Sequence, residues 1–338
     1  MICTSLLDWP GLVPGLFFFQ TNREGATDAA MGFPCCAGGA GQAGGLTDHR
    51  KVTLQLFLLA MASASCFAVG IVLAPFGLRH LSALSGAAIS VPTSAVLLLT
   101  ASPLTVDWQH WDPHSAAIFA AGGLFYPAGV TLLNFAGNRR LGPNLTAAVG
   151  NVTPLFAIAL AILFLGETLR LEQAAGIALL FLGLATIAAD RLRSHPGASL
   201  WLLGLPLLAA ALRGGAQPLV KAGLAGWPDA FAAATLAYAV SASVILLAYL
   251  LLGRGGPART LPGILWFVAV GTANGTSLLL LYMALSLGAV SLVAPVFACY
   301  PLITYAINRL LLRQRDVTPR GILGIVLTVA GVVVLLAL

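Results

Sequence analysis

Charged residues are scarce in this sequence. Asp, Glu, Lys and Arg together make up 8 % of the 338 residues and 59 % are hydrophobic, whereas a soluble domain carries about 25 % charged residues. The mean hydropathy of +0.95 therefore predicts a membrane protein with several spans. The net charge is +6, but the basic residues lie in short loops rather than along one stripe, so we expect the lipid bilayer as partner and no nucleic acid.

Several functional motifs are missing as well. The sequence has no GxxxxGK(S/T) phosphate loop, so nothing supports ATP-driven transport. All five histidines lie near the N-terminus or in loops, so they form no metal cluster and no proton relay within the membrane. The five cysteines show no CxxC spacing, which makes a disulfide framework or zinc site unexpected. We therefore expect no cofactor and no metal.

Long apolar runs fill most of the chain from residue 54 onward. Each is about long enough to cross a bilayer core of ~30 Å as a helix. In lipid the backbone must satisfy its own hydrogen bonds, so runs of this length are helices, and the predicted fold class is an all-α polytopic membrane protein. The ten predicted transmembrane helices cover residues 54–76, 81–102, 115–136, 143–165, 172–189, 199–221, 230–252, 262–284, 289–311 and 318–337.

The second half of the chain repeats the first. A shift of 148 residues places Gly176 on Gly324 and Gly183 on Gly331, and the apolar runs match in both halves. Five helices per repeat is an odd number, so the two repeats must insert with opposite orientation, as in inverted-topology transporters. The predicted domains are a disordered leader and linker at 1–50, a first five-helix repeat at 51–195 and a second at 196–338.

The fourth and fifth predicted helices carry a recognisable motif. It contains Pro154-Leu155-Phe156-Ala157, Leu163-Phe164-Leu165-Gly166-Glu167, Gln173, Gly176 and Gly183, and it resembles the EamA-type members of the drug/metabolite transporter superfamily. The second repeat carries a weaker copy with Pro295-Val296-Phe297-Ala298, in which Gln314-Arg315 replaces the usual Gly-Glu pair. The resemblance covers residues 54–338 and implies ten helices in two five-helix repeats that transport small organic solutes.

The orientation in the membrane stays open at this point. Loops after odd-numbered helices hold most of the arginines, which by the positive-inside rule puts both termini outside. The resemblance instead implies cytoplasmic termini. In either orientation we expect an integral protein of the bacterial inner (plasma) membrane.

Arg213 is the most informative single residue. It lies some fourteen residues into the sixth predicted span, and no Asp or Glu lies within any predicted span. A charge near the membrane centre costs at least ~2.5 kcal/mol, so it needs a partner or a wet cavity. We predict that Arg213 pairs with a carboxylate or phosphate on the substrate, with Gln217 beside it. The alternative is that Arg213 bonds to carbonyls freed by Gly214, Gly215 and Pro218, or extends to the interface.

Two repeat-related pairs of polar residues complete the predicted substrate site. The members of each pair are eight residues apart, so they share one face of a helix and would hydrogen-bond a solute in a common cavity. The alternative is that they form interhelical hydrogen bonds, which contribute under ~1–2 kcal/mol each. The pairs are Tyr126 with Asn134 and Asn274 with Tyr282, and the prolines predicted to act as hinges are Pro127 and Pro218.

These features predict a secondary-active exporter rather than an enzyme. Its substrate would be a small anionic or zwitterionic metabolite, bound at the midplane between the repeats, and the sequence identifies no coupling ion or counter-substrate. The first span lacks a carboxylate, which argues against a Glu-centred proton antiport. The alternatives are a multidrug exporter, a non-transporting scaffold or receptor, and a membrane-embedded enzyme that uses the cluster of Asp107, His110, Asp112 and His114.

Overall fold

The computed structural model describes residues 42–141, 146, 149–150, 152–193, 200–252 and 260–311, together with 323–324, 326–328, 330–331 and 334. The chain divides into two compact units, Met1–Leu46 and Thr47–Leu338, and the architecture below is that of the second unit. Most of the predicted leader 1–50 lies outside the described residues, and from Gln42 onward the chain is already helical.

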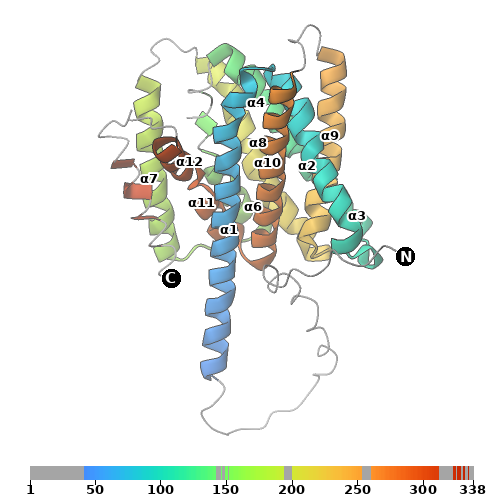
Figure 1. Ribbon diagram of the computed structural model, residues 1–338. Coiled ribbons are helices and arrows are strands. Elements are labelled where there is room, and N and C mark those ends of the chain that lie inside the picture. The colour runs from blue at the N-terminus through green and yellow to red at the C-terminus, as the bar shows by residue number, and fades with distance from the viewer. Residues whose placement is uncertain are drawn as a thin grey trace. The chain divides into compact units, whose positions relative to one another are not determined.

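Every regular element in the described part of the chain is a helix (Figure 1), which confirms the all-α prediction. Among the described residues, seven helices are long and apolar enough to cross a membrane, and two shorter apolar helices are Thr153–Leu165 and Leu171–Gly183. The predicted span 318–337 lies largely outside the described residues. The α-helices are α1 (Gln42–Leu78), α2 (Ala83–Thr105), α3 (Pro113–Gly123), α4 (Val130–Leu141), α6 (Thr153–Leu165), α7 (Leu171–Arg193), α8 (Gly204–Gly226), α9 (Ala230–Leu252), α10 (Leu261–Leu287), α11 (Val290–Phe297) and α12 (Tyr300–Leu311).

Local sequence signals set several of these boundaries. The Asp112 carboxylate accepts a hydrogen bond from the Ser115 backbone N–H and is followed by Pro113 at the first helical position, a favourable way to begin a helix. Helix α6 ends at Gly166, whose φ of 64° is left-handed. Glycine adopts this conformation without the Cβ clash that other residues meet.

Several of the predicted spans are interrupted rather than continuous, and α6, for example, begins at Thr153, inside the predicted span 143–165. Between α3 and α4 lies the π-helical segment Leu124–Gly129, in which Tyr126 has an extended backbone (φ −142°, ψ 126°) just before Pro127. A proline disfavours helical geometry in the residue that precedes it, so Pro127 explains the break. The predicted span 289–311 is likewise two helices, α11 and α12, with Ala298 and Cys299 between them. Pro218, in contrast, lies inside a continuous α8.

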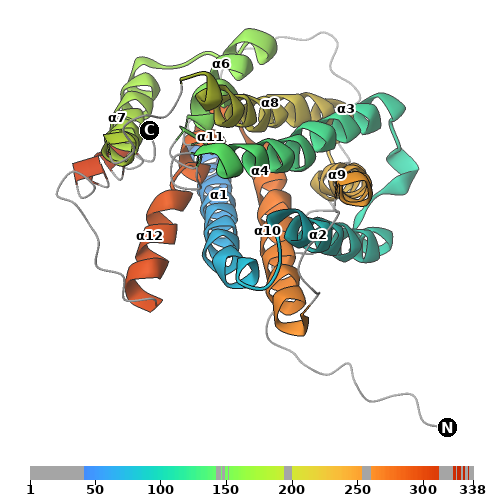
Figure 2. The same cartoon turned by 90° about the horizontal axis from the view of Figure 1, so that it is seen from above.

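The helices pack in two rows that meet at α9. Seen from above (Figure 2), α8 lies beside the broken span formed by α3 and α4 in one row, and α1, α10 and α2 lie side by side in the other. Small residues line the contacts, as is usual where membrane helices approach closely. A Cβ atom on Gly271 would overlap the Ser90 carbonyl oxygen, and one on Gly123 would overlap the Ala237 carbonyl oxygen.

A matched pair of hydrogen bonds joins the two halves at these close approaches. The Ser94 hydroxyl in α2 donates to the Gly271 carbonyl in α10 at 2.6 Å. The Ser241 hydroxyl in α9 donates to the Gly123 carbonyl in α3, also at 2.6 Å. The two donors, Ser94 and Ser241, are therefore repeat counterparts, and so are the two acceptors, Gly123 and Gly271. Their separations are close to the repeat shift of 148 residues found in the sequence.

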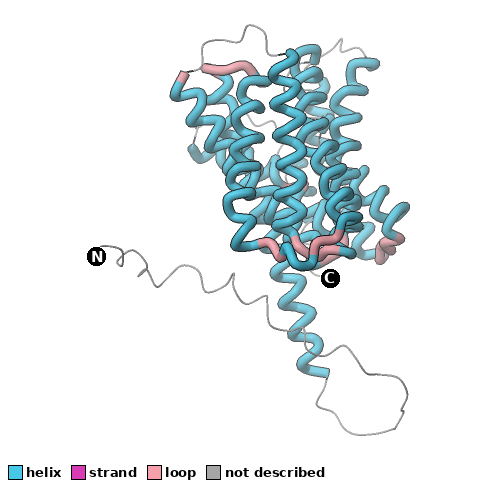
Figure 3. The backbone as a smooth tube through the Cα atoms, turned by 90° about the vertical axis from the view of Figure 1, so that its right-hand side faces the viewer, coloured by secondary structure: helices cyan, strands magenta, loops and turns pink. Residues whose placement is uncertain are grey.

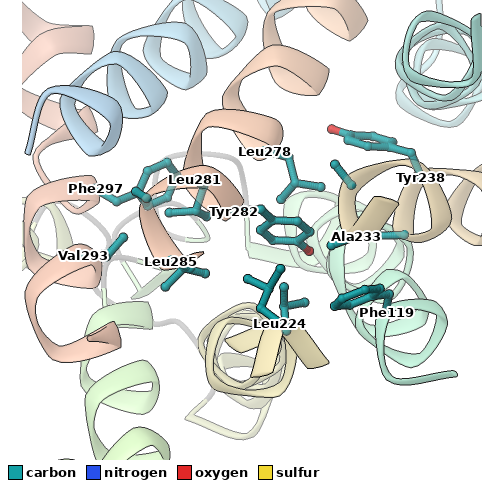
Figure 4. Close-up of a cluster of buried hydrophobic side chains, with 14 of the residues drawn as sticks. Phe119, Leu224, Ala233, Tyr238, Leu278, Leu281, Tyr282, Leu285, Val293 and Phe297 are labelled. Carbon is teal, nitrogen blue, oxygen red and sulfur yellow. The ribbon is translucent and has the colours of Figure 1, made fainter. Parts of the chain in front are cut away.

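The largest buried side chains fill the space between the two rows. Tyr282 of α10 points toward Leu224 of α8 and Phe119 of α3 (Figure 4), and all three are almost fully buried. This core holds α8, α9 and α10 together. It lies beside the region of α8 that α6, α11 and α12 approach.

Replacing Gly271 with Ala should destabilise the protein. The added methyl group would overlap the Ser90 carbonyl, and overpacking of this kind typically costs about 1–3 kcal/mol. We expect a lower melting temperature for Gly271→Ala in detergent, and a similar decrease for its counterpart Gly123→Ala.

The matched control is Gly204→Ala, because a Cβ atom at Gly204 meets nothing within 4 Å. Its melting temperature should stay at the wild-type value. Equal melting of Gly271→Ala and Gly204→Ala would contradict the close packing of α2 against α10.

Candidate substrate pocket

A small pocket lies where three helix ends meet the middle of α8. Helices α6 and α12 begin at it and α11 ends at it. Its free volume of about 10 Å³ has room for roughly one water molecule. The residues that line it are Gly150, Thr153, Pro154, Arg213, Gln217, Ala294, Phe297, Ala298 and Tyr300. The sequence-predicted residues Arg213 and Gln217 are thus brought together in one pocket.

Arg213 is held between aromatic rings rather than beside a carboxylate. Its guanidinium carbon lies 5.3 Å from the centroid of the Phe67 ring and 5.2 Å from that of the Tyr126 ring. It also interacts electrostatically with Tyr300. Among the residues that the structure describes, no Asp or Glu forms an ion pair with Arg213. Cation–π contacts stabilise a desolvated cation by about 2 kcal/mol or more, so the rings offset part of the burial cost.

Two polar atoms beside the pocket lack hydrogen-bond partners. The Arg213 Nε atom is one of them, and the Gln217 Oε1 atom, one helical turn further along α8, is the other. The Gln217 side chain is only 3 % exposed. Buried polar groups normally have partners because an unsatisfied one costs about 1–3 kcal/mol. These two atoms therefore have capacity left for a ligand.

Three aromatic side chains form one wall of the site. Phe67 lies 5.5 Å from Phe297 and 5.0 Å from Tyr300, measured between ring centroids, and Phe297 lies 5.7 Å from Tyr300. Neither Phe67 nor Phe297 was predicted from the sequence to belong to the site. The repeat could have pointed to Phe67, because Phe67 lies 146 residues before Arg213. This separation is close to the repeat shift, so the two residues occupy nearly equivalent positions in the two repeats.

The four residues of the predicted polar pairs do not gather in this pocket. Tyr126 reaches it by stacking on Arg213. Asn134 is half-buried on α4, beyond the break at Tyr126, so the spacing of eight does not by itself put these two on one face. Asn274 lies against Gly70 of α1, and its Oδ1 atom has no hydrogen-bond partner. The Tyr282 hydroxyl, also without a partner, lies in the core shown in Figure 4.

The acidic and histidine cluster before α3 holds loops together. His110 Nδ1 lies 2.6 Å from Asp107 Oδ2, and this hydrogen bond lowers the pKa of the exposed Asp107 carboxyl. A hydrogen bond with Ser115 similarly lowers the pKa of Asp112. The Asp107 backbone N–H donates to Asp229 in the α8–α9 connection at 3.1 Å. Ionised carboxylates that cap helices and join loops have a structural role, and no described group of three or more His, Cys, Asp or Glu could hold a metal.

Comparison with known proteins agrees with this architecture. The EamA-like transporter family matches the chain twice, at residues 55–189 and 199–337. The chain belongs to the EamA-like transporter family. It is therefore a membrane transporter of the drug/metabolite transporter superfamily, with the two repeats typical of EamA proteins.

No curated protein matches the chain, whereas solved structures do, and one of them illustrates the shared fold. The structure is titled "Crystal structure of protein" and superposes with a TM-score of 0.67 at 17 % sequence identity. The match covers 84 % of this chain and 97 % of that one. At this identity the similarity shows the fold alone, so the substrate of this EamA protein has to be argued from its own pocket.

Replacing Gln217 with Met should leave the protein as stable as wild type, or slightly more stable. Its Oε1 atom has no partner to lose, and exchanging an unsatisfied polar group for an apolar one of similar shape is nearly neutral or stabilising. The melting temperature in detergent measures this. The comparison variant is Ser94→Ala, which removes a satisfied buried hydrogen bond and should melt lower. If Gln217→Met melts as low as Ser94→Ala, the amide is structural.

Proposed function

We propose that this EamA protein is a secondary-active exporter of a small anionic or zwitterionic metabolite in the bacterial inner membrane. It would work by alternating access, with the pocket around Arg213 and Gln217 as the substrate site between two inverted five-helix repeats. The observation that carries the proposal is a half-buried guanidinium, at the junction of broken helices, without a carboxylate partner among the described residues.

Reciprocal contacts support a two-fold relation between the repeats, and an axis in the membrane plane would make this the inverted arrangement. If element a packs on b′ and a′ packs on b in the same way, the two units are related by a two-fold axis. The bonds of Ser94 and Ser241 have this form. So do two close approaches of α7 to the C-terminal segment: Gly183 meets the Gly324 carbonyl, and Gly331 meets the Gly176 carbonyl.

The electrostatics of the pocket favour an anion. The N-terminal ends of α6 and α12 both open onto it, since Thr153 and Tyr300 line it. The C-terminal end of α11 also lies there and carries the opposite partial charge, so two positive helix ends accompany one negative end. The N-terminal end of a helix carries a partial positive charge of about half an elementary charge, and broken helices in transporters direct such ends at anionic groups. Together with Arg213 they suit a carboxylate or phosphate. The Gln217 Oε1 acceptor would suit an N–H or O–H donor on the same solute.

The small size of the pocket is consistent with an occluded conformation. A free volume of about one water molecule cannot hold a metabolite. Binding therefore requires α6, α11 or α12 to move away from α8. The breaks next to these helix ends provide places where such a movement can occur without bending a continuous helix, and Pro127 marks a comparable break beside Tyr126.

A multidrug exporter is the second candidate, and the aromatic wall is the observation that favours it. Phe67, Phe297 and Tyr300 would stack on flat apolar compounds. A lipophilic cation, however, would meet the charge of Arg213 at close range. The two candidates therefore differ in how they depend on this residue.

Arg213→Ala should abolish the thermal stabilisation that carboxylate ligands give the purified protein, and should abolish their transport in proteoliposomes. Removing one partner of a buried charge pair costs about 2–5 kcal/mol, so we expect affinity to fall on the order of 100-fold. Arg213→Lys should lie in between, because lysine keeps the charge but loses the bidentate fork. The substrate-free protein should still fold, since no carboxylate is left unpaired.

The control is Arg170→Ala, which removes an exposed arginine from the α6–α7 connection and should leave the ligand response unchanged. Carboxylates that bind Arg213→Ala as well as wild type would contradict the anion site. Stabilisation by lipophilic cations that is insensitive to Arg213→Ala would support the multidrug exporter instead.

A further inference from the structure

Glu167 caps a helix that belongs to the other repeat. Its Oε1 atom accepts a hydrogen bond from the Val290 backbone N–H at 2.7 Å, and its Oε2 atom accepts one from the Ser291 N–H at 2.9 Å. Val290 begins α11, and the residue before it, Ala289, supplies no side-chain cap. A carboxylate at a helix N-terminus satisfies N–H groups that have no partner within the helix and also interacts favourably with the dipole.

The connection between α10 and α11 is held from its other end by Lys221. The Lys221 ammonium, on α8, donates to the Leu285 carbonyl near the end of α10 at 2.7 Å. It also attracts the Glu167 carboxylate electrostatically. The two-residue connection Gly288–Ala289 is therefore fixed on one side by α8 and on the other by the α6–α7 connection.

These contacts lie directly beside the substrate pocket. Arg213, Gln217 and Lys221 are four residues apart on α8, so they follow one another along one face of the helix. The first two line the pocket and the third holds the α10–α11 connection. Helix α11 is about 12 Å long and runs from the Glu167 cap to the pocket wall at Ala294 and Phe297.

The same contacts lie at one end of the helix bundle. The α6–α7, α8–α9 and α10–α11 connections all meet there, and Figure 3 shows most of the described loops gathered at that end. Helix α11 lies between the pocket and this end, since it runs from the Glu167 cap to the pocket wall. Movement of the α11 N-terminus away from α6 and α8 breaks both hydrogen bonds of Glu167.

We propose that Glu167 is a gate residue whose cap on α11 stabilises the conformation closed at this end, with Lys221 as a second contact of the same gate. This inference rests on the alternating access proposed above, and it adds a positioning role for a residue that does not touch the pocket. Losing the cap shifts the equilibrium toward the conformation that is open at the Glu167 end.

The sequence differs between the two repeats at this position. A shift of 148 residues places Gly166 and Glu167 on Gln314 and Arg315, and the residue after Arg315 is Asp316. An arginine side chain has only donors and cannot accept hydrogen bonds from backbone N–H groups. At this register position a carboxylate is therefore present in the first repeat and absent from the second.

The test is the accessibility of the pocket from each side of the membrane. Ala294→Cys, in the full chain with the five native cysteines replaced by Ala, is labelled with a membrane-impermeant maleimide in vesicles of both orientations. Thr168→Cys, in the exposed α6–α7 connection, identifies the side that carries Glu167. Adding Glu167→Gln, which keeps the shape but at most one acceptor, should raise labelling from that side about ten-fold and lower it from the other.

The matched control is Glu172→Gln, the same change at an exposed position in the first turn of α7, and it should alter neither rate. Unchanged labelling in a folded Glu167→Gln variant overturns the proposal. If that variant does not fold, Lys221→Met is used instead, and it should change the labelling in the same direction. Unchanged labelling in Lys221→Met would also overturn the proposal. The readout needs no substrate, so failure of the gate is distinct from failure of the Arg213 site.

Discussion

The placement of one positive charge, that of Arg213, determines how the centre of this transporter is built. The charge lies in the middle of α8, and no described membrane-spanning helix supplies a carboxylate to neutralise it. Phe67 and Tyr126 provide π-faces on which the guanidinium rests. The N-terminal ends of α6 and α12 and the C-terminal end of α11 also lie at the pocket, which gives two partial positive charges and one partial negative charge. In the proposed function, an anionic substrate would supply the negative charge that this site lacks.

The helix breaks follow from the same requirement. In a bilayer, irregular backbone is tolerated only where protein or a cavity covers it, and the breaks before α6 and α12 both lie at the pocket. The break at Tyr126 places its ring against Arg213. The polar and flexible parts of the bundle are thus concentrated in one place, while serine–carbonyl bonds and small residues fix the remaining contacts between the repeats.

Glu167 shows how a residue outside the pocket can influence it. Its carboxylate joins the connection after α6 to the first turn of α11. Because α11 also forms the pocket wall, the stability of this cap and the accessibility of the pocket are linked through one short helix.

The sequence by itself determined the all-helical membrane class, the two repeats and the EamA family. It also pointed to Arg213 and Gln217 as neighbours in one site. These features can be recognised because hydropathy, repeat spacing and an isolated charge within an apolar run are visible in the sequence itself. Only the tertiary structure decided which aromatic rings surround Arg213, that Asn134 and Tyr282 do not line the pocket, and that Glu167 caps a helix 123 residues away. Contacts between distant segments depend on how helices rotate and cross. A break such as that at Tyr126 changes the rotation of the helix beyond it. The spacing of two residues along the sequence then no longer tells whether their side chains share one face.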